Sequence, residues 1–217
     1  MIAFKFLARG AVGPFTGFEW PTPSASSPGV WVEVPPASFP NRGIHGCLVE
    51  QLPYWLDEEL WEAELDGVVH HTPMQVITSR GRLLRHVVSW TEEVAAELAL
   101  ACLFKARDAA ADLLQRNRRG KDADQLSACA DVAQLERAAR AMTTTGEANF
   151  LANLIGYVAD AAKRAKMNHV GTVCYVTADL ARVASGSPEA AVSERIWQGR
   201  WIAARLQLPQ TDSARSV

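Results

Sequence analysis

The segment GIHGC (43–47) places a histidine and a thiol two residues apart, between glycines. On a β-strand, residues i and i+2 face the same side, so His45 and Cys47 are expected to point together. The glycines leave room for another backbone or for a ligand. Such a pair could be a nucleophile with its base, or two ligands of a metal ion that His70 and His71 complete. The structural alternative is a buried thiol beside a histidine bonded to backbone. Adjacent histidines rarely share one ion, so we expect no metal.

Carboxylates and arginines form a second group of candidates. In ELWEAELDG, alternation puts Glu62 and Glu64 on one face, where Glu62 could do acid–base work if the face were desolvated. A solvated face is the alternative. In RGRLLRH, strict alternation puts Arg82 and His86 on one side and Arg85 on the other. Arg82 and Arg85 are expected to bind a carboxylate or phosphate, or else to protect a strand edge from pairing.

Aromatic residues are concentrated near the start of the chain. Among them, Trp20, Trp31 and Tyr54 are predicted to line a pocket for a planar ligand. The alternative is that they fill the core of a small sheet. Either way, the chemistry-bearing residues precede position 90.

Composition limits the class of protein. The 217 residues carry a formal net charge of −2, whereas a nucleic-acid binder usually has a basic excess. No window approaches about 18 uninterrupted apolar residues, and the first residues lack a signal-peptide pattern, so no membrane span is expected. The four cysteines are far apart and predict reduced core residues of a cytoplasmic protein. Since GxGxxG, P-loop, HExxH and GxSxG motifs are absent, we expect no cofactor.

The elements that must position these residues change in type near residue 90. Alternating patterns predict strands at 2–8, 30–34, 44–50, 59–65, 75–78 and 82–88. Alanine-rich periodic patterns predict helices at 91–116, 122–142, 144–166, 170–185 and 187–206. We therefore predict an α+β fold, in which a small, mainly antiparallel sheet packs against a bundle of about five helices. The predicted subdomains are 1–90 and 91–208, followed by a flexible tail at 209–217.

Two resemblances accompany these patterns. The strings GPFTGFEWP, PGVWVEV, GIHGC, LPYWL, ELWEAELDG and RGRLLRHV, with the ending SERIWQGRWIAARLQL, resemble a group of actinobacterial proteins with no established activity. The order GIHGC, LPYWL, ELWEAELDG also resembles ADP-ribosyltransferase-like domains. That resemblance implies NAD binding, with His45 where the family has a tyrosine that stacks on nicotinamide. The family's N-terminal histidine–glycine pair is missing from KFLARG.

The functional expectation is a small-molecule-acting protein, a cofactor-independent enzyme of actinobacterial metabolism such as biosynthesis. Its pocket is expected where the sheet meets the helices, with His45 as acid–base group and Arg82 or Arg85 as anion anchor. Two alternatives stay open: a protein-interaction module without chemistry, and an NAD-using ADP-ribosyltransferase-like protein. The expected partners are a small-molecule ligand and a second copy of the chain, bound through the helical half.

Overall fold

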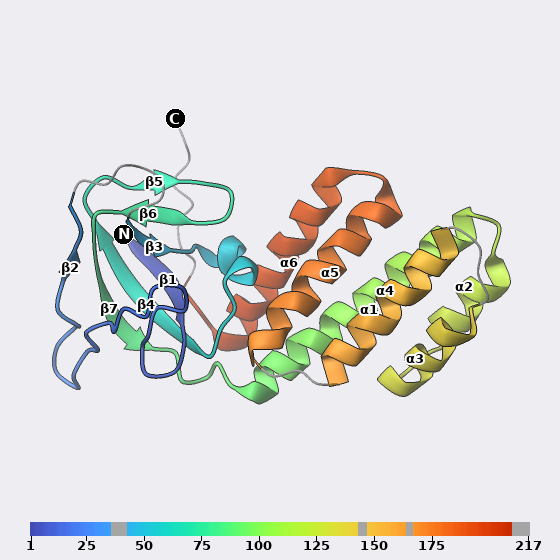
Figure 1. The fold of residues 1–217 in the computed structure, drawn as a ribbon, viewed down its shortest axis with the longest axis horizontal. Coiled ribbons are helices and arrows are strands. Elements are labelled where there is room, and N and C mark those ends of the chain that lie inside the picture. Colours follow the sequence, from blue (N-terminus) through green and yellow to red (C-terminus); the bar gives the residue numbers. More distant parts are fainter. Residues whose placement is uncertain (36–42, 143–146, 164–166, 210–217) are drawn as a thin grey trace. The chain divides into compact units, whose positions relative to one another are not determined.

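The computed structural model describes residues 1–35, 43–142, 147–163 and 167–209. Over these residues the chain is α+β, as the sequence predicts (Figure 1). Two compact units are found: a β unit of Met1–Thr91 with Gly199–Val217, and a helical unit of Glu92–Gln198. The start predicted for the third helix at Thr144, and the predicted tail from 210 onward, lie outside the described residues.

The β unit contains two antiparallel sheets (Figure 1). One has four strands in the order β1, β4, β7, β2, and the other has three in the order β3, β6, β5. The strands are β1 (Ile2–Leu7), β2 (Val32–Glu33), β3 (Ile44–Gly46), β4 (Glu59–Asp66), β5 (His70–His71), β6 (Val76–Thr78) and β7 (Arg80–His86). A 3-10 helix, η1 (Val49–Tyr54), occupies the end of the predicted 44–50 strand.

A short bridge joins the two sheets. Phe4 of β1 and Cys47, just after β3, exchange two backbone hydrogen bonds of 2.8 Å each. The next residue of β1, Lys5, pairs with Trp61 on the neighbouring strand β4. Alternation places Lys5 on the face of β1 that also carries Ala3 and Leu7.

That face covers the main apolar core of the β unit. The core side chains come from both sheets and from the segment before β2, and they are Ala3, Leu7, Ala11, Trp20, Ile44, Leu48, Trp61, Ala63, Leu65, Val76 and Leu83. Small and branched side chains from both sheets close this cluster, and β1 also buries Phe4 and Phe6 on its other face. A lysine therefore extends from a strand face that is otherwise apolar.

The helices are mostly where their periodicity predicts. They are α1 (Glu92–Arg116), α2 (Gly120–Ser127), α3 (Val132–Ala141), α4 (Glu147–Lys163), α5 (Met167–Ser185) and α6 (Pro188–Leu206). Gly186, with φ of 71°, ends α5 in the left-handed region that favours glycine. All four cysteines are buried and free.

The prediction of one helix over 122–142 is wrong. The chain forms α2 and α3 instead, because Asp131 takes an extended conformation and caps α3. Its side chain accepts a hydrogen bond of 2.7 Å from the Gln134 backbone N–H. An aspartate in that position satisfies a free helix N–H group, so a new helix start competes with continuation. The described residues thus form six α-helices.

Candidate functional site

The predicted His45–Cys47 pair lies at the junction of the two sheets. His45 is central in β3 and pairs with Ile77 of β6. The Cys47 side chain is buried, and its thiol donates to the Phe4 backbone oxygen at 3.3 Å. Burial raises the pKa of this thiol to about 12. Cys47 is therefore protonated at neutral pH, which favours a structural role over that of a nucleophile.

Lys5 contacts this junction and is absent from the sequence-based candidates. Its Nζ donates to the His45 backbone oxygen at 2.6 Å and lies 4.7 Å from the centre of the Trp20 ring. Burial lowers the pKa of the Lys5 ammonium from an ordinary value of 10.5 to about 8. We call Lys5, Trp20 and His45 the Lys5 cluster.

The His45 imidazole is shifted in the same direction. Burial and then the nearby positive charge of Lys5 lower its pKa, and the Gln75 side chain opposes the shift. At neutral pH the cluster thus combines an uncharged imidazole with an amine that is deprotonated far more often than an exposed lysine. These are the properties of a base and of an amine nucleophile.

The predicted carboxylate and arginine candidates are engaged with one another across two strands. Glu62 accepts a hydrogen bond of 2.7 Å from Arg85, and Glu64 accepts one of 2.8 Å from Arg82. Glu62 and Glu64 share a face of β4, and so do their arginine partners on β7. The four side chains therefore form neighbouring ion pairs on one side of the sheet.

The predicted placement of the β7 side chains is accordingly wrong. Arg82 and Arg85 lie on the same side, and His86 lies on the other, stacked on Trp61 with ring centres 4.5 Å apart. The cause is an irregularity in the register between Glu62 and Ala63. Such a bulge adds one residue to a strand and reverses the alternation beyond it.

The predicted aromatic ligand walls do not all belong to one group. Trp20 is buried in the core beside Lys5. Trp31 lies 4.4 Å from the Arg82 guanidinium and 4.2 Å from that of Arg80. Tyr54 is at the end of η1 and is partly buried. Of Trp20, Trp31 and Tyr54, therefore, Trp20 alone belongs to the Lys5 cluster that includes His45.

His70 and His71, considered as metal ligands, form the exposed strand β5. Over the described residues, no group of three or more His, Cys, Asp or Glu side chains is arranged to hold a metal ion.

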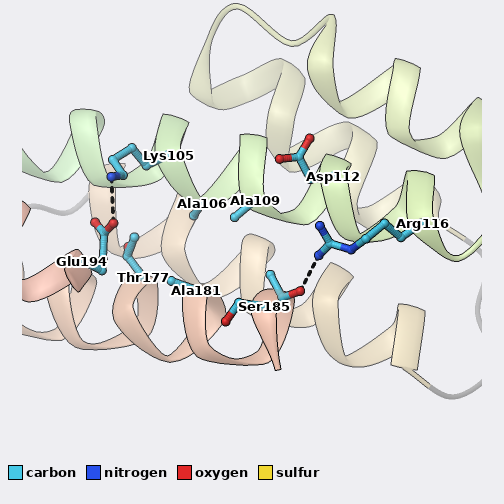
Figure 2. A pocket seen from close by; sticks show the side chains of 10 residues that line it. Lys105, Ala106, Ala109, Asp112, Arg116, Thr177, Ala181, Ser185 and Glu194 are labelled. Carbon is cyan, nitrogen blue, oxygen red and sulfur yellow. Dashed lines mark hydrogen bonds and ion pairs between the residues drawn. The ribbon is translucent and has the colours of Figure 1, made fainter. Parts of the chain in front are cut away.

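A cleft in the helical unit was not anticipated from the sequence. It has a volume of about 270 Å³ and is lined by residues of α1, α5 and α6: Lys105, Ala106, Ala109, Asp112, Arg116, Thr177, Ala181, Ala184, Ser185 and Glu194 (Figure 2). These residues are common types spread over 90 positions, so no spacing in the sequence brings them together. Helix packing alone assembles this set.

No protein-family model, curated protein or solved structure matches the chain. Among the helices of the described part, none has both the length and the apolarity that crossing a membrane requires.

Proposed function

We propose that the β unit acts on a small carbonyl compound without a cofactor, with Lys5 as the reacting amine. The observation that carries this proposal is the position of the Lys5 Nζ, 2.6 Å from the His45 oxygen and 4.7 Å from the Trp20 ring. An amine with a pKa of about 8 is uncharged far more often near neutral pH than an ordinary lysine amine. A lysine desolvated in this way is suited to form an imine with an aldehyde or ketone.

The proposed step is balanced without a further reactant. The uncharged Lys5 nitrogen attacks the carbonyl carbon and forms a C–N bond. Two protons move in turn from the nitrogen to the former carbonyl oxygen, and that oxygen leaves as water to give the imine. The uncharged His45 imidazole accepts each proton from the nitrogen and passes it to the oxygen, a role its lowered pKa supports. Hydrolysis of the imine returns the free amine.

The test is reductive trapping of the imine. The full chain is incubated with pyruvate or glyceraldehyde and cyanoborohydride near pH 7.5, and modified peptides are quantified by mass spectrometry. Lys5 is expected to be modified about tenfold faster or more than the exposed Lys121, because far more of it is uncharged at that pH.

Two variants make the result specific. Lys5→Arg keeps the positive charge but cannot form an imine, so the fast modification should disappear. Lys121→Arg is the matched control and should leave modification of Lys5 unchanged. Modification of Lys5 no faster than that of Lys121 would show that Lys5 only caps a carbonyl, and would remove the proposal.

A further inference from the structure

The helical cleft has two ends of different character. Lys105 and Arg116 are eleven residues apart on α1, which corresponds to about 16 Å along the helix axis. Between them, Ala106 and Ala109 of α1 face Ala181 of α5. Their methyl groups give the cleft an apolar floor with a charged group at each end (Figure 2).

At the first end the charges satisfy one another. The Lys105 Nζ lies 2.9 Å from a carboxylate oxygen of Glu194 and 4.1 Å from the centre of the Trp197 ring. The Glu194 side chain is only 5% exposed, and its other oxygen accepts a hydrogen bond of 3.3 Å from Gln198. This end is a fixed, internally neutral wall.

At the second end, charges of both signs are available. Arg116 donates one N–H to the Ala184 backbone oxygen, which fixes the guanidinium beside the end of α5 (Figure 2). Asp112 is four residues before Arg116, a spacing that permits an ion pair on a helix. The guanidinium is instead directed to Ala184, and among the described residues neither Asp112 nor Arg116 forms an ion pair. A free carboxylate and a guanidinium with unused N–H groups therefore border the same cleft.

We infer that this cleft binds a small zwitterion of the amino-acid type. The Arg116 guanidinium binds the ligand's carboxylate, since its planar fork matches that group. The Asp112 carboxylate binds the ligand's ammonium, and the ligand's side chain lies along the alanine floor toward the Lys105–Glu194 wall. The volume of about 270 Å³ is just below the roughly 300–1,000 Å³ of sites for drug-sized ligands, which suits a molecule of this size.

This site is confined to the helical unit and is independent of the proposed chemistry of Lys5. A ligand with one charge would leave either Asp112 or Arg116 without its partner. The cleft should therefore distinguish a zwitterion from analogues that lack either charge.

The experiment is an NMR titration of the full, isotope-labelled chain with each standard L-amino acid, and with N-acetyl-leucine and leucinamide. Binding should shift the Arg116 Nε–H signal and the amide signals of Ala109 and Ala181. Leucine should bind about tenfold or more tightly than N-acetyl-leucine, which lacks the ammonium, and than leucinamide, which lacks the carboxylate.

Variants assign the two charges. Asp112→Asn breaks no ion pair within the described residues and should remove the preference for leucine over N-acetyl-leucine. Arg116→Gln should remove the preference over leucinamide. Arg140→Gln, on α3, is the matched control and should change neither preference.

The inference is overturned if no amino acid shifts these signals, or if leucinamide and N-acetyl-leucine bind as tightly as leucine. Because Arg116 also holds the Ala184 carbonyl, its variant could fail to fold. The Asp112→Asn variant and the two leucine analogues then still decide the outcome.

Discussion

Lys5 extends from β1 between the Trp20 ring and the His45 carbonyl, where its ammonium is poorly hydrated. Desolvation penalises the charged form, so folding lowers the pKa of this lysine to about 8. Between that value and 10.5, the unfolded chain binds more protons at Lys5 than the folded chain does. The stability of the protein therefore increases with pH across this interval, as the cost of burying the charge disappears.

This linkage gives a prediction for Lys5→Met. Relative to wild type, the variant should gain stability at pH 7 and lose this advantage toward pH 10, with a change in relative unfolding free energy on the order of 2 kcal/mol. Urea titrations at several pH values measure it. Lys121→Met, at an exposed position, is the control and should show no such pH dependence. A constant difference between the Lys5 variant and wild type would contradict the lowered pKa.

At this scale the sequence predicted only part of the site. Alternation correctly put Glu62 and Glu64 on one face, because the period of a strand is local. Lys5 was missed because in IAFKFLA both faces are apolar, so alternation alone cannot tell which face encloses the core. Its ammonium contacts the backbone of His45, forty residues away in the sequence. No local pattern encodes such a contact.

At the scale of elements, composition and period predicted most strands and helices, but two local events were beyond them. A bulge between Glu62 and Ala63 reversed the alternation of the second half of β7. The cap at Asp131 divided one predicted helix into two. Both depend on which of two competing backbone hydrogen-bond patterns is satisfied. The apolar pattern is the same in either case.

Replacing each of two helical glycines with alanine should change the unfolding free energy in opposite directions. At Gly199 of α6, a Cβ would overlap the Val49 carbonyl oxygen and lie 3.0 Å from the Glu50 Cα. Gly199→Ala should therefore lower the unfolding free energy by about 1–3 kcal/mol. At Gly156 of α4, no atom lies within 4 Å of an added Cβ, so Gly156→Ala should raise it by up to about 1 kcal/mol through helix propensity. Urea titration followed by circular dichroism measures both. Equal effects would contradict the close approach at Gly199.

At the scale of the whole molecule, the β unit is discontinuous in sequence. The last turns of α6, with Ile202 and Leu206 buried, and the buried Leu208 after the helix belong to it. Arg200 also lies 2.5 Å from a carboxylate oxygen of Glu50. The first segment of the β unit ends at Thr91. Periodicity along α6 gives no sign that one helix contributes to two units. The division of α6 between two units depends on tertiary contacts, which a helical period does not encode.

Truncation after Gln198 tests the dependence of the β unit on this segment. Each fully buried aliphatic side chain contributes about 1.5–3 kcal/mol, so the loss of three approaches the total stability of a typical domain. The NMR signals of the Trp20 and Trp61 indoles should collapse to unfolded positions. The Arg200→Ala variant, which removes only an exposed ion pair, should leave them dispersed. Native indole signals in the truncated chain would show that residues 199–208 are dispensable.

The shared α6 also has a consequence for biosynthesis on the ribosome. Domains generally fold in the order in which they are synthesised, from the N-terminus. Here the residues of the helical unit are complete once position 198 has been translated, whereas the β unit still lacks its segment from Gly199 onward. The nascent β unit therefore stays incomplete while more than a hundred later residues are added, and it matures after the helical unit although its strands precede the helices.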